Sequence, residues 1–488
     1  PPPPPPPPPP PFFFHPPPGN PAAQESRGLG DVYKRQISGT AVAYVGKGNN
    51  GGDALVALKV LRAAGWKVSV RCSFPLLELG ILPRRKLREL GGVEVRHDAF
   101  ELVMGPGPLL LIDGLLGIGS KGPMRDPIAG LAAEMNALRD GAGAEVVSVD
   151  IPSGVDPDNG RVSEGAVRAG LTATIGVPKK GLVEDLALDH VGRIEVIPLE
   201  ELPDSYPGDE LTTAPKLRGL LPPRDFDTHK GQAGRVGIVA GSRGMLGAGS
   251  LSALGALRGG AGLVTLYVLE KDYLPMVSTG VPPEVMVRAL SSYEDLGSEH
   301  HAAMVIGPGL GCPGETETDA LLKLLECSRM PLVVDADGLN LMSAAGMEGR
   351  VKSHMVLTPH PGEMERMFPE ASVLGRADCA RAFVGSYPCT LLYKGSRTIV
   401  TSAGEDLHYN VTGNPGMASG GQGDVLSGVL GALLASGMTS LDAARSAAWL
   451  AGRASEIALE KRQSQESLLA SDTANALGEA FRALRGGR

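Results

Sequence analysis

Short apolar runs, each with the length of a strand, alternate with polar segments and with helical patterns along most of the chain. In the first half these runs are residues 41–45, 68–72, 109–112 and 146–149, and apolar residues at helical spacing occupy residues 54–64. Apolar strands that alternate with helices indicate a mostly parallel sheet covered on both faces. The ligand crevice of such a sheet lies beyond the carboxyl ends of its strands.

The same alternation continues in the second half of the chain. Strand-like runs cover residues 235–240, 304–306, 332–334, 355–357 and 390–393, while residues 248–257 and 425–435 have helical patterns. Each strand-like run is followed directly by a glycine or a polar residue. We therefore predict an α/β chain with two doubly wound, three-layer domains.

Changes in composition divide the chain into four parts. Residues 1–36 begin with eleven prolines and have no periodic pattern. We expect them to be disordered or foreign to the native protein, with a proline-rich recognition segment as the alternative. Residues 37–199 and 229–488 form the two predicted domains. Prolines, acidic residues and few apolar pairs predict a linker at residues 200–228.

Composition and charge exclude several kinds of protein. With 42% hydrophobic and 20% charged residues, this chain of 488 residues can bury the cores of two or three domains. A net charge of −8 without a long Lys/Arg run argues against nucleic acid as a partner. No uncharged apolar run reaches the roughly 18 residues of a membrane span. The five cysteines are scattered without the spacing of metal ligands, so we expect neither a zinc site nor a disulfide framework. Cysteines without disulfides fit a reducing compartment, and we expect a cytoplasmic location.

A glycine-rich stretch, residues 412–424, ends at Asp424 and runs into the apolar helix predicted at residues 425–435. Glycines let the backbone approach a ligand closely, and the unpaired N–H groups at a helix start attract phosphate. A carboxylate there would repel phosphate, so it indicates proton transfer from a hydroxyl that lies beside the phosphate. The alternative is that Asp424 only caps the helix.

In the first half, three polar segments follow strands and should meet at one edge of the sheet. They are residues 46–53 and 114–122, which we expect to be loops, and residues 150–154. The first segment matches neither the dinucleotide fingerprint nor the P-loop. Oxygen atoms of Asn50, Asp113 and Ser153 could together ligate a hard cation, whereas each residue alone could serve in a turn or a cap.

Single polar residues follow strands in the second half as well. They are Asp335 and Asp337, His360, and Lys394. Taken singly, the aspartates could cap a helix, His360 could be a rigid turn residue between prolines, and Lys394 could be a solvated turn lysine. Their common position at strand ends instead predicts one ligand site near the helix start at Asp424.

The motifs of the first half, in their order and spacing, resemble those of the NAD(P)H-hydrate epimerase family. They are Asn49-Asn-Gly-Gly-Asp53, Asp113-Gly-Leu-Leu-Gly117 and Asp150-Ile-Pro-Ser-Gly154. The resemblance implies a Rossmann-like domain that interconverts the two C6 epimers of the hydrated nicotinamide, with Asp150 as a catalytic residue. It also implies a potassium ion held by Asn50, Asp113 and Ser153. The implied substrate contacts are Asn49, Asn50, Gly51, Gly52, Asp53, Gly117, Ile118, Gly119, Ser120, Lys121, Gly122, Pro123 and Asp150.

Two features depart from the pattern of that family. Ala54 stands where the family usually has another glycine, and the proline tract stands where helices normally precede the first strand. Without those helices, core surface or a dimer face would be exposed.

The motifs of the second half resemble the ribokinase-like fold and, within it, the nucleotide-dependent NAD(P)H-hydrate dehydratase family. The resemblance covers nearly all of residues 229–471 and rests mainly on residues 358–363 and 414–424, in which Gln422 replaces the more usual serine. It implies that Asp424 is the catalytic base. The implied contacts with the hydrate are Ala248, Gly309, His360 and Asp424, and those with the nucleotide are Lys394, Gly395, Ser396, Arg397, Thr398 and Gly423.

Together the resemblances imply a bifunctional enzyme that repairs hydrated NADH and NADPH. It would epimerise the R and S hydrates at C6 and dehydrate the S form, releasing phosphate and AMP. The implied cofactors are K+ in the first domain and Mg2+ with ADP in the second, and we expect a homo-oligomer whose other partners are small molecules. The alternative is a ribokinase-like kinase of a vitamin-precursor alcohol with a non-catalytic first domain. The sequence does not decide whether ADP or ATP is the donor. It also does not decide between the hydrates of NADH and NADPH as the preferred substrate.

Overall fold

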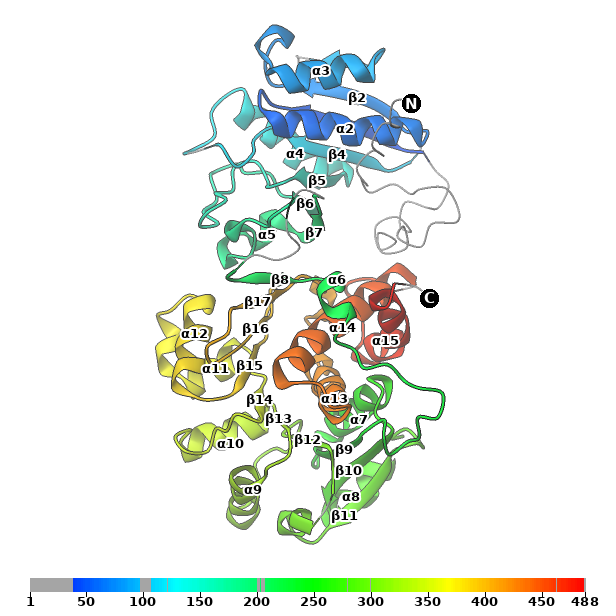
Figure 1. The fold of residues 1–488 in the computed structure, drawn as a ribbon, viewed down its shortest axis with the longest axis vertical. Helices are drawn as coiled ribbons and strands as arrows, with labels where there is room; N and C mark the ends of the chain where they lie inside the picture. The colour runs from blue at the N-terminus through cyan, green and yellow to red at the C-terminus, as the bar shows by residue number, and fades with distance from the viewer. Residues whose placement is uncertain are drawn as a thin grey trace, which may run out of the picture. The chain divides into compact units, whose positions relative to one another are not determined.

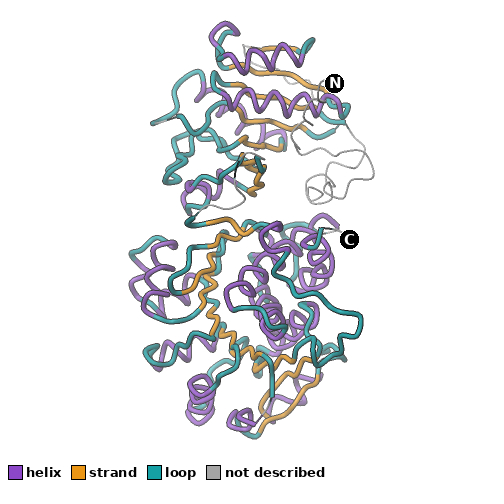
Figure 2. The backbone as a smooth tube through the Cα atoms, viewed as in Figure 1, coloured by secondary structure: helices purple, strands orange, loops and turns teal. Residues whose placement is uncertain are grey.

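The computed structural model describes residues 38–96, 107–120, 122–199, 202, 207–278, 280–298, 300–461 and 463–486. The chain divides into two compact units, Pro1–Tyr206 and Pro207–Arg488, each built around one β-sheet (Figure 1). Helices flank the strands in both units, which confirms the predicted α/β class (Figure 2). The proline-rich range 1–36 lies outside the described residues.

The described part of the first unit contains a seven-stranded sheet with the order β3-β2-β1-β4-β5-β6-β7, in which all neighbouring strands are parallel. Its strands are β1 Thr40–Val45, β2 Lys67–Cys72, β3 Glu94–Arg96, β4 Leu109–Gly114, β5 Glu145–Val149, β6 Leu171–Ile175 and β7 Arg193–Ile197. The strand order reverses between β1 and β4. The residues that follow these two strands therefore flank the crevice where such sheets bind ligands.

Helices pack on both faces of this sheet. They are α2 Asn49–Ala63, α3 Ile81–Leu90, α4 Ile128–Ala142 and α5 Leu188–Val191, with the 3-10 helices η2 Leu76–Glu78, η3 Lys180–Leu182 and η4 Asp185–Ala187. Along β1, Ala41, Ala43 and Val45 share a core cluster with α2, whereas Val42 and Tyr44 share one with α4. Side chains of a strand alternate between its faces. Because both faces are covered, β1 is a continuous apolar run.

An ion pair between the buried Arg71 and the partly buried Glu134 joins β2 to α4. The Arg71 guanidinium donates to both carboxylate oxygens of Glu134, at 3.1 and 2.8 Å, and the Tyr44 hydroxyl donates to the same carboxylate at 2.9 Å. Burial and the negative charge of Glu134 raise the pKa of Tyr44, so the phenol stays protonated. Because Arg71 is only 5% exposed, loss of Glu134 would leave a buried charge without this partner.

We expect Glu134→Ala to lower the free energy of unfolding of the first unit by about 3 kcal/mol, the usual cost of removing one partner of a buried pair. The two tryptophans of the chain, Trp66 and Trp449, lie in different units. Urea unfolding followed by Trp66 fluorescence in a Trp449→Phe background therefore reports on the first unit alone. The exposed Glu145→Ala is the control and should change stability by less than about 0.5 kcal/mol. Overlapping curves for Glu134→Ala and its parent would contradict the prediction.

The described part of the second unit contains a ten-stranded sheet with the order β11-β10-β9-β12-β13-β14-β15-β16-β17-β8. Its strands are β8 Glu210–Thr212, β9 Arg235–Val239, β10 Leu263–Leu269, β11 Met286–Leu290, β12 Ala303–Ile306, β13 Leu332–Val334, β14 Met355–Leu357, β15 Thr390–Tyr393, β16 Ile399–Ser402 and β17 His408–Asn410. The pairs β15–β16 and β16–β17 are antiparallel, and the others are parallel. The strand order reverses between β9 and β12.

Two layers of helices enclose this sheet. They are α6 Ala214–Arg218, α7 Leu246–Arg258, α8 Glu270–Ser278, α9 Glu315–Cys327, α10 Asp337–Ala345, α11 Pro361–Met367, α12 Arg376–Ser386, α13 Gln422–Ala435, α14 Ser440–Lys461 and α15 Ala470–Leu484, with the 3-10 helices η5 Tyr293–Ser298, η6 Pro369–Ser372 and η7 Pro415–Met417. Helices α9 to α12 lie on one face, and α7, α13, α14 and α15 lie on the other (Figure 1). A Cβ at Gly428 would lie 2.7 Å from the Ala256 nitrogen, so α13 packs directly against the backbone of α7. No helix in the described ranges is both long enough and apolar enough to cross a bilayer.

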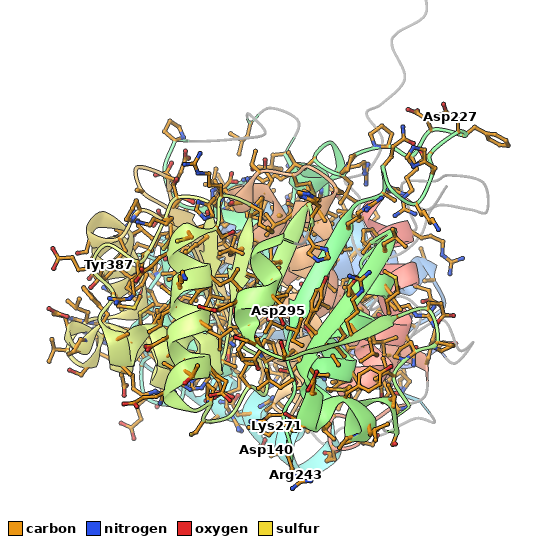
Figure 3. The ribbon with its side chains drawn as sticks, turned by 90° about the horizontal axis from the view of Figure 1, so that it is seen from below. Asp140, Asp227, Arg243, Lys271, Asp295 and Tyr387 are labelled. Atoms are coloured by element: carbon orange, nitrogen blue, oxygen red, sulfur yellow. The ribbon has the colours of Figure 1, made fainter. Side chains whose placement is uncertain are left out.

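Part of the predicted linker, residues 200–228, has regular structure instead. Strand β8 pairs in parallel with β17. The Glu210 carboxylate on β8 lies 3.0 Å from His408 Nδ1 and accepts a hydrogen bond from Arg445 of α14 at 2.7 Å. The irregular composition hid this strand because it is short and pairs with residues almost 200 positions away. Asp227, farther along the range, is exposed and projects away from the rest of the unit (Figure 3).

Candidate active sites

Helix α2 begins inside the first polar motif, so Asn49 to Asp53 are its first five residues. Residues 46–48 form a loop as expected, whereas the loop prediction was wrong for residues 49–53. Gly51 permits the early start, because a Cβ there would lie 2.6 Å from the carbonyl oxygen of Gly46. A Cβ at Gly114 would lie 2.6 Å from the Ala54 Cβ. The absent side chain at residue 114 therefore makes room for Ala54, which replaces the usual glycine.

The ends of β1, β4 and β5 meet around the buried Asn50. Its Nδ2 donates to the carbonyl oxygens of Leu116 at 2.5 Å and Val149 at 3.0 Å. The Leu116 N–H in turn donates to Ser153 Oγ at 2.9 Å. Two of the three predicted cation ligands, Asn50 and Ser153, are thus linked through one residue of the segment after β4.

Asp113, the third predicted cation ligand, is fully buried at the end of β4. Its carboxylate accepts hydrogen bonds from Ser153 Oγ at 2.6 Å, Ser153 N at 2.8 Å, Ser148 Oγ at 2.9 Å and Leu115 N at 3.2 Å. Burial raises the pKa of Asp113, although these hydrogen bonds favour its charged form. A hard monovalent cation fits this cluster, because it takes carboxylate, hydroxyl and carbonyl oxygens and would balance the buried carboxylate.

Asp150 follows β5 and has a φ of 66°, in the left-handed region that residues other than glycine rarely adopt. Its carboxylate pairs with the Lys179 ammonium and accepts a hydrogen bond from Ile175 N at 3.0 Å. Lys179 also donates to the Ile175 carbonyl oxygen at 3.0 Å. Lys179 was not among the predicted site residues. Because it closely follows β6, the strand-end rule applied to residues 171–175 would have found it.

The negative charge of Asp150 acts on Asp53, the fifth residue of α2. Burial and the Asp150 carboxylate raise the pKa of Asp53 to about 6, and Lys86 opposes the rise. One carboxylate of this unit therefore has a lysine partner, while the other has a raised pKa. Two carboxyl groups in such different surroundings suit acid–base chemistry, because one can donate a proton while the other accepts one.

The segment after β4 forms an open turn at the same edge of the sheet. A Cβ at Gly117 would lie 3.3 Å from the Asn50 Cβ, so the turn passes close to the start of α2. Ser120 Oγ donates to the Gly117 carbonyl oxygen at 2.8 Å and closes the turn. The exposed members of the segment are Ile118, Gly119, Gly122 and Pro123. Lys121 lies outside the described residues.

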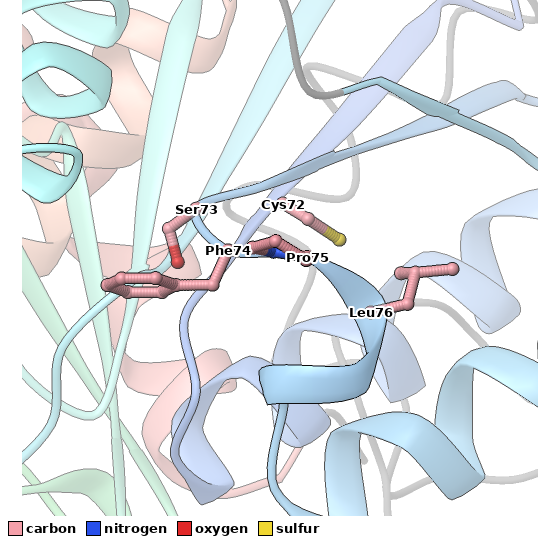
Figure 4. A pocket seen from close by; sticks show the side chains of 5 residues that line it. All are labelled: Cys72, Ser73, Phe74, Pro75 and Leu76. Atoms are coloured by element: carbon pink, nitrogen blue, oxygen red, sulfur yellow. The ribbon is translucent and has the colours of Figure 1, made fainter.

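A hollow not predicted from the sequence follows β2, the strand beside β1. It is lined by Cys72, Ser73, Phe74, Pro75 and Leu76 (Figure 4). The Lys47 ammonium lies 3.8 Å from the centre of the Phe74 ring, and Ser73 Oγ donates to the Val45 carbonyl oxygen at 3.0 Å. The hollow therefore adjoins the residues that connect β1 to α2.

In the second unit, Asp424 is the third residue of α13 and does not cap it. The cap position is Gly421, whose φ of 91° lies in the left-handed region, and no side chain caps the helix. A Cβ at Gly420 would meet no atom within 4 Å, so the backbone just before the helix is open. The capping alternative for Asp424 is therefore wrong. Its carboxylate stands in the first turn of α13, next to open glycine backbone.

Polar side chains from four elements meet beside this helix start. Lys394 Nζ lies 2.7 Å from Asp335 Oδ1 and 3.7 Å from Glu363 Oε2. Asp335 Oδ2 accepts a hydrogen bond at 2.5 Å from Ser427 Oγ, which lies one turn beyond Gly423 on α13. Both carboxylate oxygens of Asp335 are thus bonded within this network, and no side chain caps α10, so Asp335 is not a helix cap. The Lys394 side chain is only 19% exposed and is ion-paired, so it is not a solvated turn lysine. The parts of Glu363 and Ser427 in this network were not predicted, since nothing local marks them.

The residues around Asp424 raise the pKa of its carboxyl group. Burial and the charge of Asp335 raise the pKa of Asp424 to about 6; Lys394 opposes the rise and Asp337 adds to it. A carboxyl group with this pKa is mostly ionised at neutral pH and still basic enough to take up a proton. These are the properties that a general base needs.

Two of the residues expected to face the hydrate lie side by side. A Cβ at Gly309, which follows β12, would lie 2.8 Å from the Ala248 Cβ in α7. The loop after β12 is tied to α10, because Gly311 N donates to Asp337 Oδ2 at 2.8 Å. Asp337 therefore holds this loop and is not the cap of α10, whose cap position is Ala336.

His360 caps α11 and its ring is exposed. Nδ1 accepts hydrogen bonds from Gly362 N at 3.0 Å and Glu363 N at 3.3 Å, while His360 N donates to Glu363 Oε2 at 2.8 Å. This reciprocal arrangement is a capping box. It fixes the Glu363 carboxylate that lies near Lys394.

The expected nucleotide segment is the turn between β15 and β16. Gly395 and Ser396 are exposed there, and Thr398 Oγ1 donates to the Gly395 carbonyl oxygen at 3.1 Å. Arg397 is only 7% exposed. Burial lowers the pKa of Arg397 to about 10, with Glu456 opposing. The turn therefore offers backbone groups at the surface while its arginine lies inside.

The glycine-rich stretch before α13 is anchored to α14. Gly413 N donates to Glu456 Oε1 at 3.0 Å, and Thr412 Oγ1 donates to the Trp449 carbonyl oxygen at 2.9 Å. Gln422, at the other end of the stretch, is 9% exposed, and its Oε1 has no hydrogen-bond partner in the described part of the chain. The amide oxygen of Gln422 is therefore a buried acceptor without a partner among the described residues.

The chain matches two family models. Residues 236–477 match the model described as NAD(P)H-hydrate dehydratase, and residues 28–181 match the model described as YjeF-related protein N-terminus. The match at the amino-terminal side begins at residue 28, before the domain boundary expected at residue 37.

Similar proteins match most of the chain. The Bifunctional NAD(P)H-hydrate repair enzyme Nnr of Gloeobacter violaceus is 37% identical over 84% of this chain and 83% of its own length. The protein of the same name from Escherichia coli is 34% identical over 88% of this chain and 82% of its own length. A ribokinase-like superfamily protein from Enterococcus faecalis shares the fold, with a TM-score of 0.51, 24% identity, and coverage of 58% of this chain and 98% of its own. The chain belongs to the family of bifunctional NAD(P)H-hydrate repair enzymes.

Proposed function

We propose that this chain repairs hydrated NADH and NADPH by epimerisation in its first unit and nucleotide-dependent dehydration in its second. The observation that carries the proposal is the position of Asp424 in the first turn of α13, beside open glycine backbone and with a pKa of about 6. Such a carboxylate can take a proton from a hydroxyl that a helix start holds against a phosphate. Membership of the repair-enzyme family supports the same reaction.

In the second unit, Asp424 would accept the proton of the C6 hydroxyl while that oxygen takes a phosphoryl group from ADP, which leaves as AMP. The N–H groups of residues 420–423 would stabilise the charge on the transferring phosphoryl group. Phosphate then leaves C6 and a proton leaves the neighbouring ring carbon, which restores the double bond of NAD(P)H. We assign the S hydrate to this site, as the family resemblance implies.

Substrate and nucleotide would approach Asp424 from different elements. Ala248, Gly309 and His360 would face the hydrate. The nucleotide side, as the family resemblance implies it, consists of Lys394, Gly395, Ser396, Arg397, Thr398 and Gly423, of which Lys394 is already paired with two carboxylates. Mg2+ would neutralise charge on the phosphates of ADP when bound. Among the described residues no group of three His, Cys, Asp or Glu side chains is placed to hold a metal.

In the first unit, epimerisation requires the C6–O bond to break and to form again on the opposite face of the ring. The leaving hydroxyl must gain a proton to depart as water, and the incoming water must lose one. Asp150, with Asp53 beside it, would exchange these protons. Asn49 to Asp53 and Gly117 to Pro123 would hold the substrate. A potassium ion at Asn50, Asp113 and Ser153 would orient the segment after β4; the buried Asp113 and its oxygen-rich surroundings support it.

We further propose that the protein is a cytoplasmic homo-oligomer. It would accept the hydrates of both NADH and NADPH and would prefer ADP as the phosphoryl donor. The five cysteines, all free, support a reducing compartment. The donor and the oligomeric state follow from the family resemblance alone.

Incubation of the full chain with chemically hydrated NADH and either ADP or ATP tests the dehydratase reaction. We expect the absorbance of reduced nicotinamide to recover with ADP, with one AMP and one phosphate formed for each NADH. Faster recovery with ATP would overturn the choice of donor. A phosphorylated alcohol that accumulates without NADH would instead indicate a small-alcohol kinase of the same fold. Full conversion of an R and S mixture, faster in K+ than in tetramethylammonium buffer, is expected if the first unit epimerises.

A further inference from the structure

We propose that Lys394 is a positioning residue of the dehydratase site. Asp335 and Glu363 hold its ammonium next to the start of α13, where it balances the negative charge of the carboxylates around Asp424. It does not bind a nucleotide phosphate. This inference rests on the proposed function for its kinetic consequences. The family resemblance places Lys394 on the nucleotide side, so the structure changes its expected role.

The backbone of Lys394 is fixed from both sides. Its N–H donates to the Pro359 carbonyl oxygen at 2.8 Å, and its carbonyl oxygen accepts from the Arg376 guanidinium at 3.2 Å. The end of β15 is thereby tied to the Pro359-His360 turn after β14. From this position the lysine side chain reaches the start of α13, where its Nζ would lie 3.6 Å from a Cβ at Gly423.

The ammonium is already engaged by two carboxylates. It donates to Asp335 at 2.7 Å and lies 3.7 Å from Glu363. The side chains of Asp335 and Glu363 are 2% and 6% exposed, and that of Lys394 is 19% exposed. Burial lowers the pKa of Lys394, but Asp335 and Glu363 outweigh it and leave the pKa raised, so the ammonium stays charged. A phosphate that approached it would also approach the two carboxylates, which repel an anion.

The same cluster is bonded to the helix that carries Asp424. Ser427 Oγ bridges Asp335 Oδ2 at 2.5 Å and the Gly423 carbonyl oxygen at 3.0 Å. A Cβ at Gly423 would lie 3.6 Å from Lys394 Nζ and 3.9 Å from Asp335 Oδ2. The Lys394–Asp335 pair thus lies directly against the residue before Asp424. A change in this pair must act on the first turn of α13.

Charge balance gives Lys394 a measurable effect. The charged groups that act on Asp424 are Asp335 at the end of β13, Asp337 of α10 and Lys394, and the two aspartates raise the pKa of Asp424 whereas Lys394 lowers it. Glu363 of α11 faces Lys394 from the other side. Without Lys394, Asp424 would keep its proton to higher pH and would be less often ready to act as a base.

The test compares Lys394→Met with Lys394→Arg and with Lys323→Met, a matched exchange of an exposed lysine in the same unit. For Lys394→Met we expect the acid limb of kcat/KM to move up by about one to two pH units. Activity should then fall about two- to ten-fold at pH 7 and recover toward wild type near pH 9. Lys394→Arg and Lys323→Met should keep the limb near its wild-type position, and KM for ADP should stay within about two-fold in all variants.

A second pair of measurements separates positioning from phosphate binding. Asp335→Asn should move the acid limb to lower pH, opposite to Lys394→Met, because it removes a negative charge near Asp424. The increase in Tm caused by saturating ADP should persist in Lys394→Met; this binding readout needs no turnover, so it tests Lys394 even if the proposed reaction fails. Loss of that increase, or a ten-fold rise in KM for ADP with an unmoved limb, would overturn the inference.

Discussion

Asp424→Asn is expected to lower kcat for nucleotide-dependent NADH recovery by about 100-fold or more, the usual contribution of a general base. The exchange keeps the shape of the side chain and removes its ability to take a proton. Helix α13 should be unaffected, because Asp424 is not its cap. Steady-state measurements of nicotinamide absorbance at saturating hydrate and ADP give kcat directly.

The wild-type pH profile provides an independent check on Asp424. Because burial and Asp335 raise the pKa of Asp424 to about 6, kcat/KM should fall as the pH drops through about 6. In Asp424→Asn the residual activity should lack this limb. A carboxyl group whose pKa is raised by folding disfavours the folded state once it ionises, so the variant should have an equal or higher Tm above pH 6. That difference should vanish as the pH falls toward the ordinary aspartate pKa of about 3.9.

Asp378→Asn is a matched control for this experiment. Asp378 is the third residue of α12, as Asp424 is of α13, but it is exposed. Its exchange should leave kcat and the pH profile unchanged. Full turnover by Asp424→Asn under the same conditions would show that another group accepts the proton.

Asp150→Asn is expected to slow exchange between the R and S hydrates by about 100-fold or more, since it removes a group that transfers protons. Asparagine is suitable here because it tolerates the left-handed φ of 66° better than most residues. The variant should therefore fold while losing the charge that pairs with Lys179. Chiral chromatography of the hydrates, in an Asp424→Asn background so that the S form is not consumed, measures the exchange.

The control for this variant is Asp189→Asn, at an exposed position of α5 in the same unit. It should exchange the epimers at the rate of its parent. An unchanged rate in Asp150→Asn would remove Asp150 from the proton-transfer step and would leave Asp53 as the carboxyl group to examine next.

Much of the fold follows from local pattern. The apolar runs at residues 41–45 and 332–334 were predictable as strands, because strands of a parallel sheet are buried on both faces and must be apolar throughout. The position of Asp424 at the start of a helix was also predictable, since glycines precede it and an apolar run follows. Residues 49–53 were predicted as a loop, because glycine and asparagine favour turns, yet packing of Gly51 against Gly46 starts the helix earlier.

The partners of the charged side chains could not be predicted in this way. Lys394 and Asp335 are 59 positions apart, and Lys179 and Asp150 are 29 apart. Which strand ends become neighbours depends on the order of strands in the sheet, and no local pattern states that order. The same reason hid β8, a strand of three residues whose only described strand partner is the distant β17.

By itself the sequence determined the α/β class, the two domains and the polar residues that gather at the carboxyl ends of the strands, because burial and turn chemistry act on neighbouring residues. Only the tertiary structure decided how those residues are paired. It joined Lys394 to Asp335 and Glu363 and so gave Asp424 its surroundings. The strength of a base depends on burial and on charges brought from distant parts of the chain, and these exist only once the sheet has formed.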